Sequence, residues 1–148
     1  MVTRIEIATR PGQRDPRGEE VSRTVRGFLG IPVRRVRTRD VYRIEAELTA
    51  EEARRVVTEF ADPVREKGAI GRVEDGPFDV AVTVAYKPGV TDPVGKSARV
   101  AVEDTLGRPL GEGSAVYTST LYLLDGVDRA QAERITWDLL ANSVIETV

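Results

Sequence analysis

Apolar and polar residues alternate in two stretches of the chain, 2–9 and 79–86. In the first stretch Ile5 and Ile7 fall on one side of an extended chain, and charged residues fall on the other. The second stretch repeats this pattern with valines at alternate positions. A period of two is typical of a strand with one buried face, so each stretch is predicted to be a β-strand.

Apolar residues recur with helical spacing in four other stretches, and each spacing gives one apolar stripe that would face a core. The stripes are Val21, Val25, Phe28 and Leu29; Ala53, Val56, Val57 and Phe60; Ala98, Ala101, Val102, Thr105 and Leu106; and Ala132, Ile135 and Leu139 with Thr136 and Leu140 beside them. The helix starts are marked as well. Asp15 and Asp92 each precede a proline, and Thr49 and Asp128 each open a capping box. Four helices are therefore predicted to begin just after these residues.

A β-rich stretch lies between the two helices of each half. Residues 31–48 are predicted to form two short strands or one long bent strand, because no tight-turn sequence divides them. Residues 115–124 are apolar or hydroxylic on both faces, as expected of a strand that is covered on both sides. Each half of the chain is thus predicted to run β-α-β-β-α.

A short phrase stands before the first helix of each half. Arg10–Gly18 reads RPGQRDPRG, and Lys87–Gly95 reads KPGVTDPVG. A repeat with a period near half the chain predicts a tandem duplication, here of an α+β unit. Repeat 1 is predicted to span residues 1–67, the linker 68–78 and repeat 2 residues 79–148.

One such repeat is too small to supply a large core by itself. Its antiparallel sheet, with helices packed on one face, would leave the other face and a strand edge open. A second copy would cover the sheet face and the strand edge that the first copy exposes. The tandem is therefore predicted to resemble a pseudo-twofold dimer whose two units belong to one chain. Tyr42 and Tyr122, like Thr38 and Thr118, occupy matching positions in the two halves.

The composition excludes several classes of function. The chain of 148 residues carries 22 basic and 24 acidic residues and a net charge of -2, which is unlike a nucleic-acid-binding domain. It has no Cys and no His, so thiol nucleophiles, disulfides and imidazole bases are excluded. No apolar run approaches the length of a membrane span and no secretory signal is present, so we expect a cytoplasmic protein. The basic run from Arg34 to Arg39 is interpreted as a solvated strand face or a partner surface in preference to a phosphate site.

Candidate chemistry is sparse. No phosphate-loop, dinucleotide, hydrolase or metalloprotease motif is present. The repeated phrase joins a strand to a helix N-terminus, where an anion could bind, but the capping aspartate already supplies a negative charge. A structural junction is therefore the favoured interpretation. Tyr117, Thr118, Ser119 and Tyr122 carry hydroxyls on a strand with no base placed nearby, and Trp137 is interpreted as a core or partner contact. No catalytic residue, metal site or cofactor is predicted.

The repeated phrase resembles the opening of the PurS family, the small subunit of formylglycinamide ribonucleotide amidotransferase. Lys87–Gly95 fits that opening, and 141–146 fits the family's closing Ala-Asn-Pro-Val-Ile-Glu, with Ser143 in place of Pro. The first copy fits less well, with Arg10 in place of Lys and Gln13 in place of Val. The chain is also similar to the N-terminal region of some long single-chain synthases, in which two such units precede the catalytic domains.

The resemblance implies a role in purine biosynthesis. The family's complex converts formylglycinamide ribonucleotide to its amidine with ATP and with ammonia released from glutamine. Its small subunit pairs with itself and bridges the synthetase subunit PurL to the glutaminase subunit PurQ, without catalytic residues of its own. The expected partners are therefore PurL and PurQ, with self-association as a further expectation and with neither nucleic acid nor membrane involved.

Two alternatives remain open at this point: a small-molecule regulatory module, and the N-terminal segment of a longer synthase. The residues that carry the family motif or are candidates for the partner interface come from both halves. They are Arg10, Pro11, Gly12, Asp15, Gly18, Lys87, Pro88, Gly89, Asp92, Gly95, Tyr117, Thr118, Ser119, Tyr122 and Asn142.

Overall fold

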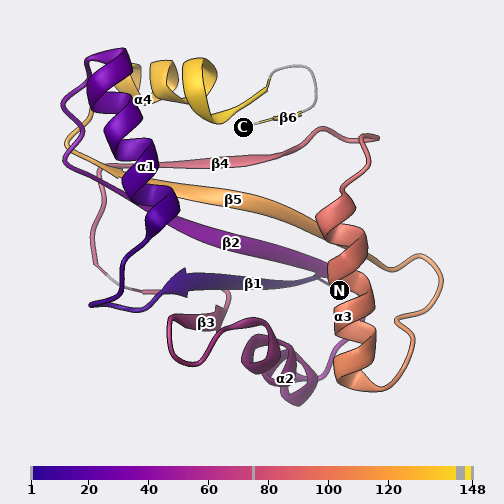
Figure 1. Ribbon diagram of the computed structural model, residues 1–148. Helices are drawn as coiled ribbons and strands as arrows, with labels where there is room; N and C mark the ends of the chain where they lie inside the picture. The colour runs from indigo at the N-terminus through magenta and orange to yellow at the C-terminus, as the bar shows by residue number, and fades with distance from the viewer. Residues whose placement is uncertain (1, 75, 143–145, 148) are drawn as a thin grey trace. The chain divides into compact units, whose positions relative to one another are not determined.

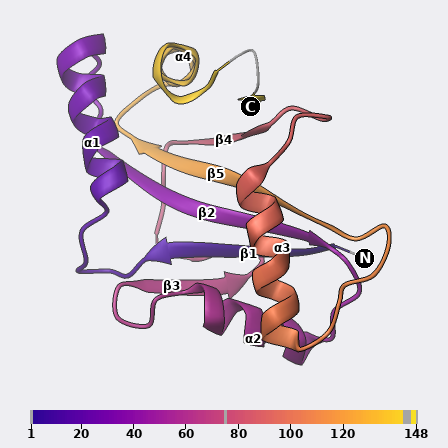
Figure 2. The ribbon, with the colours of Figure 1, turned by 45° about the vertical axis from the view of Figure 1, so that its right-hand side comes forward.

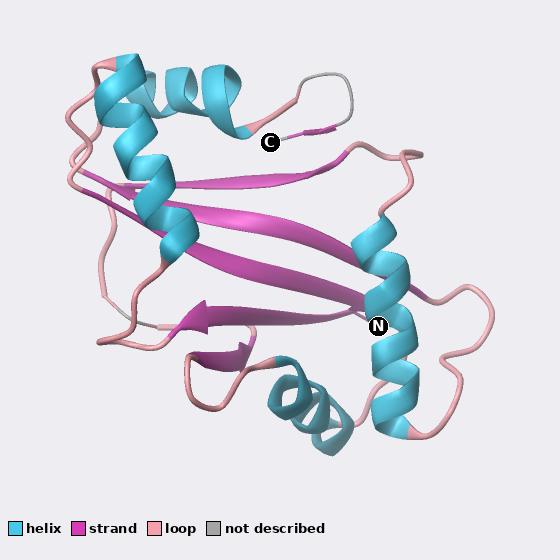
Figure 3. Ribbon diagram, viewed as in Figure 1, coloured by secondary structure: helices cyan, strands magenta, loops and turns pink. Residues whose placement is uncertain are grey.

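The computed structural model describes residues 2–74, 76–142, 146 and 147. Each half of the chain runs strand, helix, strand, helix, strand (Figures 1 and 3). The elements of the first half are β1 (Val2–Thr9), α1 (Pro16–Thr24) with the π turn η1 (Val25–Leu29), β2 (Arg35–Glu45), α2 (Ala50–Phe60) and β3 (Glu66–Ile70). Those of the second half are β4 (Val80–Tyr86), α3 (Pro93–Leu106), β5 (Ala115–Asp125), α4 (Arg129–Ile135) with the π turn η2 (Thr136–Leu140), and β6 (Glu146–Thr147). The predicted α+β class is confirmed.

The predicted order β-α-β-β-α is wrong in one respect. The stretch between α1 and α2 forms one long strand, β2, and the additional strand of each half comes after its second helix. Glu66–Ile70 has no alternating pattern that would mark it as a strand. It is extended because it pairs with β1, with Ile5 opposite Ile70 and Thr9 opposite Glu66 (Figure 2). Pairing with a distant segment, rather than local pattern, therefore decides this element.

The strands are hydrogen-bonded in the order β3-β1-β2-β5-β4-β6. The described pairs β1–β3, β4–β5 and β4–β6 are antiparallel. On β4, Val80 lies opposite Leu124 and Val84 lies opposite Thr120. The two-residue strand β6 pairs with Ala85 and Tyr86 at the end of β4.

The chain divides into two compact units, and each takes segments from both halves of the sequence. Unit 1 comprises 1–10, 40–74 and 91–118; unit 2 comprises 11–39, 75–90 and 119–148. Unit 1 thus contains α2 and α3, and unit 2 contains α1 and α4. These units are defined by contacts in space and do not follow the repeats along the sequence. The predicted repeats and the linker between them therefore remain predictions.

Unit 1 has a core of aliphatic side chains from its strands and both of its helices. The buried members are Ile5, Ile7, Ile44, Ala46, Leu48, Val56, Ala98, Val102, Leu110 and Val116. Tyr42 and Phe60 pack at the edge of this core with their rings 4.9 Å apart in an edge-to-face arrangement. Helix α3 contributes Ala98 and Val102, which are one turn apart, as its predicted stripe requires.

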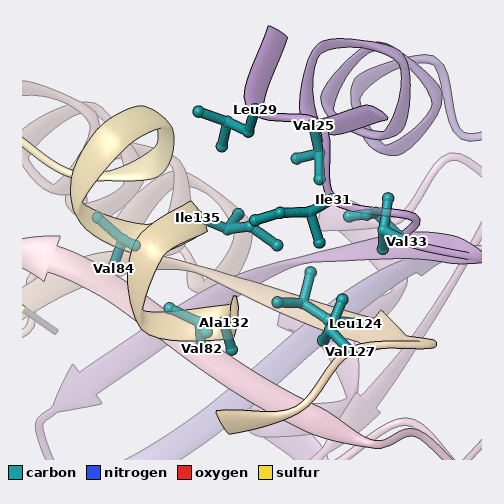
Figure 4. Packing of buried hydrophobic residues seen from close by; sticks show 11 residues of the cluster. Val25, Leu29, Ile31, Val33, Val82, Val84, Leu124, Val127, Ala132 and Ile135 are labelled. Atoms are coloured by element: carbon teal, nitrogen blue, oxygen red, sulfur yellow. The ribbon is translucent and has the colours of Figure 1, made fainter. Parts of the chain in front are cut away.

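Unit 2 has a separate core, which Figure 4 shows at close range. Its buried members are Val25, Leu29, Ile31, Val33, Val36, Val82, Val84, Leu124, Val127, Ala132 and Ile135. Ile135 and Val25 are fully buried and come from α4 and the start of η1. The alternate valines of β4 point into this core, which confirms the buried face predicted for that strand.

The two π turns alter the predicted helix stripes. Phe28 is 80% exposed although Val25 and Leu29 are buried, and Leu139 is 36% exposed. In η1 the Ile31 and Gly30 N–H groups both reach the Val25 carbonyl, and in η2 the Ala141 N–H reaches the Thr136 carbonyl. A π turn holds more residues than an α turn. The angular positions of Phe28 and Leu139 therefore differ from those that a 3.6-residue period predicts.

Opposite faces of α3 offer a matched test of this packing. Val102 is fully buried and Val100 is 57% exposed. We expect Val102→Ala to lower the free energy of unfolding by about 2 kcal/mol, because two buried methyl groups are lost and a cavity remains. Val100→Ala should change it by less than about 0.5 kcal/mol. Urea unfolding of both variants checks this, and equal effects would contradict the assignment of faces.

Candidate functional site

The first copy of the repeated phrase forms the junction that leads into α1. A Pro11-Gly12 turn, with Gly12 at φ 85°, redirects the chain after β1. Asp15 is the N-cap of α1, and one of its carboxylate oxygens accepts a hydrogen bond from the Gly18 N–H at 2.9 Å. The cap satisfies one of the N–H groups that every helix start leaves without a partner.

The same carboxylate also holds strand β2. Its second oxygen accepts from the backbone N–H of Thr38 at 2.8 Å, and the Thr38 hydroxyl lies 2.9 and 3.0 Å from the two oxygens. Thr38 is 4% exposed. Asp15 thus joins the first turn of α1 to the middle of β2.

Close packing completes this junction. Gly18 is buried in the first turn of α1, and a Cβ atom added there would overlap the carbonyl oxygen of Val36 on β2. Only a residue without a side chain lets helix and strand approach this closely. The Asp-Pro-x-Gly spacing is therefore a requirement of the junction, with aspartate for the hydrogen bonds and glycine for the approach.

The second copy of the phrase builds the same geometry in unit 1. Asp92 caps α3 and accepts from the Gly95 N–H at 2.7 Å. It also accepts from the Thr118 N–H at 2.7 Å, and the Thr118 hydroxyl lies 2.9 and 3.0 Å from its oxygens. A Cβ atom on Gly95 would overlap the Val116 carbonyl oxygen. The preceding Gly89 has the same φ of 85° as Gly12.

These contacts favour a structural role for the phrase. Each capping carboxylate binds the first turn of a helix and a strand together, and its charge occupies the place where an external anion would otherwise approach the helix N-terminus. Both oxygens of each carboxylate already accept hydrogen bonds from donors of the protein. The junctions therefore position the helices rather than offering a phosphate site.

The remaining predicted residues lie on the flanks of these junctions and along β5. Arg10 donates its N–H to the Arg65 carbonyl, and the Lys87 carbonyl accepts from the Val90 N–H within the turn that contains Pro88. Ser119 lies opposite Ala85 in the sheet. Tyr122 packs against the core of unit 2.

Two further predicted residues lie at or near the surface. Tyr117 is 49% exposed, and Asn142 is exposed. Residues 143–145 of the closing motif are outside the described residues. Of the hydroxyl residues predicted on β5, Thr118 joins a junction through a described contact. Its counterpart Thr38 was not among the predicted site residues, although its match with Thr118 was a signal for it.

The basic run in the first half is not a solvated face throughout. Arg39 is 2% exposed, and its guanidinium donates to the Thr38 carbonyl at 3.1 Å. The Arg37 guanidinium donates to the Pro77 carbonyl at 2.6 Å and lies 3.7 Å from the Asp125 carboxylate. Asp125 is 5% exposed and also accepts from Arg35 at 3.2 Å. These side chains mainly tie unit 2 together, a role that the sequence pattern did not reveal.

An ion pair between Glu52 and Arg108 stabilises unit 1. Glu52 caps its own helix start by accepting from the Thr49 N–H at 3.0 Å, and it accepts from the Arg108 guanidinium at 2.9 and 3.1 Å. The hydrogen bonds from Arg108, followed by the one from the Thr49 backbone, lower the pKa of Glu52 to about 2. The pair joins the start of α2 to the residues that follow α3.

Neither a metal centre nor a membrane helix emerges from the described part of the chain. No group of three or more acidic side chains there is arranged to hold a metal ion. Within the same residues, no helix has the length and apolar character needed to cross a bilayer.

The geometry defines a small α+β chain built on two equivalent strand–helix junctions. Residues 2–64 match the family model PurS, phosphoribosylformylglycinamidine (FGAM) synthase. The resemblance predicted from the sequence is confirmed, although the match lies in the half that was expected to fit less well. The family connects the chain with FGAM synthase and purine biosynthesis. No curated protein matches the chain.

Two glycines of the first helix region test the junction. We expect Gly18→Ala to destabilise the fold by roughly 3 kcal/mol, because its Cβ atom would overlap the Val36 carbonyl and force helix and strand apart. Gly27 has open space around its Cβ position, so Gly27→Ala should stabilise the fold by roughly 0.5–1 kcal/mol. Thermal and urea unfolding measure the stability of both variants. Similar effects of the two substitutions would rule out the close approach of α1 to β2.

The lowered pKa of Glu52 predicts a pH dependence of stability. Its pKa is about 2 in the folded chain against the ordinary value of 4.5. The ionised group therefore stabilises the fold above about pH 5, and this stabilisation is lost as the pH falls toward 2.

Glu52→Gln keeps the capping box but removes the ion pair with Arg108. The free energy difference between wild type and variant should be largest near pH 7 and should shrink below pH 5. Urea unfolding at a series of pH values measures it, and a difference that stays constant with pH would contradict the assignment.

Proposed function

We propose that this chain is a non-catalytic bridging subunit of FGAM synthase. In this role it links the synthetase subunit PurL to the glutaminase subunit PurQ, so that ammonia released from glutamine reaches the synthetase. The observation that carries the proposal is the PurS match over residues 2–64. The family is connected with this enzyme, and the two aspartates of the repeated phrase are committed to capping contacts within the chain.

We further propose that the chain carries two PurS-like units and so takes the place of a pair of single-unit subunits. The support is the equivalence of the two junctions. Asp15 and Asp92 accept from a glycine N–H three residues on, and each also binds a threonine on the neighbouring strand. Unrelated segments would not be expected to share this set of contacts.

Exposed aromatic side chains in unit 2 suit a bridging role. Phe28 in η1 is 80% exposed and Trp137 in η2 is 50% exposed. Large aromatic groups left at a surface are typical of protein–protein contacts, and π turns are frequent at functional sites. Together with Tyr117 and the exposed motif residues Arg10 and Lys87, they are the candidate contacts with PurL and PurQ. A cytoplasmic location, as the sequence predicts, belongs to the same proposal.

Reconstitution of the amidotransferase tests the bridging role. PurL and PurQ should lose most glutamine-dependent synthesis of the amidine when this chain is omitted. Synthesis from added ammonia should persist, because the synthetase then needs no ammonia from the glutaminase subunit. Adding the purified chain back should restore the glutamine-dependent rate. Full glutamine-dependent activity without the chain would overturn the proposal.

A further inference from the structure

A surface pocket lies at one end of unit 2, where β2 and β4 begin and β5 ends (Figure 1). Its volume is about 430 Å³. None of its residues belongs to the described core of this unit or to its strand–helix junction. The residues that line the pocket are Arg34, Arg35, Pro77, Phe78, Asp79 and Asp125.

The backbone around this pocket is held in place. Arg34 donates its N–H to the Asp125 carbonyl at 2.8 Å. A Cβ atom added to Gly126 would lie 2.9 Å from the Arg34 nitrogen, so the end of β5 packs closely against this residue. Across the pocket, the Asp79 N–H donates to a carbonyl of β5 at 3.0 Å. The points from which the side chains of Arg34 and Phe78 project are therefore fixed.

The ion pairs of the pocket leave one cation over. Asp125 is buried and pairs with Arg35 at 3.2 Å, and the Arg37 guanidinium lies 3.7 Å from the same carboxylate. The Asp79 carboxylate accepts a backbone N–H of the turn after β5 at 2.6 Å. Arg34 is exposed, and within the described residues its guanidinium has no hydrogen bond or ion pair. Three arginines thus meet two aspartates, and Arg34 is the cation that an external carboxylate can reach.

Phe78 supplies the apolar part of the pocket, and its ring is 45% exposed. The chain is tied down on both sides of it. The Pro77 carbonyl accepts from the Arg37 guanidinium at 2.6 Å, and the next residue, Asp79, is bound to β5. Aromatic residues and arginine are enriched at protein interfaces, where a few such side chains carry most of the binding energy. The pocket therefore has the composition of a docking site.

The corresponding stretch of unit 1 shows that the fold does not require these arginines. In each unit a glycine with positive φ, Gly30 or Gly107, follows the first helix, and a proline and a buried aliphatic residue come shortly after it. The two stretches then diverge. In unit 2, Arg34 and Arg35 lead directly into β2, whereas in unit 1 the Gly-Glu-Gly-Ser loop 111–114 leads into β5. Positions that both units share serve the fold, so the unshared arginines are available for a partner.

The chemistry of the pocket selects its occupant. The parallel N–H groups of a guanidinium match the two oxygens of a carboxylate, which Arg34 can therefore bind in a bidentate manner. Arg35, whose side chain is more than half exposed, adds positive charge beside it. An apolar side chain next to the carboxylate would cover the ring of Phe78. A basic segment would instead be repelled by the arginines.

We propose that this pocket docks an acidic segment of a partner subunit, whose carboxylate pairs with Arg34 and whose neighbouring apolar side chain packs on Phe78. This inference rests on the proposed function, because the partner is a subunit of the same complex. Attraction between opposite charges orients the segment, and burial of the Phe78 ring supplies affinity.

Charge reversal at the pocket tests the docking. Arg34→Glu should weaken binding of the chain to PurL and PurQ by about tenfold or more, because it sets one carboxylate against another. Arg54→Glu makes the same change of charge at an exposed position on α2 and should alter binding by less than about twofold. Sedimentation measures the binding, and circular dichroism establishes that both variants are folded. Equal effects of the two substitutions would overturn the inference.

The aromatic ring is tested separately. Phe78→Ala should weaken binding roughly tenfold, because the ring that the partner covers is lost. Phe78→Leu keeps an apolar side chain at the same place and should weaken binding less. Sedimentation again measures both variants. Wild-type affinity of Phe78→Ala would contradict the proposed packing.

A zero-length crosslink identifies the occupant. In the Arg34→Lys variant a carbodiimide can join the introduced amine to a carboxylate in contact with it, which it does not do with a guanidinium. Mass spectrometry of the assembled complex should recover a peptide of PurL or PurQ joined through an aspartate or glutamate. The Arg54→Lys variant should give no such peptide. Crosslinks that reach only carboxylates of this chain in an assembled complex would overturn the inference.

The outcomes distinguish this inference from the proposed function. If the complex assembles and neither Arg34→Glu nor Phe78→Ala affects it, the pocket inference fails and the bridging role stands. If the wild-type chain binds neither PurL nor PurQ, both fail. If the crosslink joins two copies of this chain, the occupant is a second copy and the proposed partner is wrong.

Discussion

The contact on which each unit depends is a carboxylate that binds a helix and a strand at once. Asp15 and Asp92 cap α1 and α3 and also accept hydrogen bonds from Thr38 and Thr118. Hydrogen bonds to a charged acceptor are stronger than neutral ones. Glycine three residues on from each aspartate lets the helix approach the strand closely enough for these bonds to form. The position of each helix over its core follows from this junction.

The two units share this junction but differ in how their other parts are held. In unit 1 the Glu52–Arg108 ion pair joins the start of α2 to the residues after α3. Unit 2 has Gln131 at the corresponding capping position, and the apolar Ile31 follows Gly30 where Arg108 follows Gly107. Ile31 is buried in the core of unit 2. Unit 1 thus uses an ion pair at a position where unit 2 uses apolar burial.

Local chemistry predicted much of the fold. The starts of all four helices were predicted because a capping residue acts on N–H groups only two or three positions away. The buried face of β4 was predicted because alternation reports the side of a strand directly. The single buried face predicted for β1 is wrong, because Glu6 and Ala8 on the face opposite Ile5 and Ile7 are each 2% exposed. The π turns were not, since Phe28 and Leu139 fit a regular helical stripe and nothing in the local pattern signals the wider turn. Among the candidate site residues, Asp15 comes together with Gly18, and Asp92 with Gly95 and Thr118. Thr38 matched Thr118 in the two halves but was not named as a site residue, because no local pattern shows which distant aspartate either threonine binds.

The sequence by itself determined the α+β class, the helix starts and the buried face of β4. All of these depend on residues that are near one another in the chain. Tertiary structure decided that Glu66–Ile70 is a strand, that Arg39 is buried, and that each unit combines segments from both halves. These features depend on which distant segments pair, and a pattern read along one stretch carries no information about its partner.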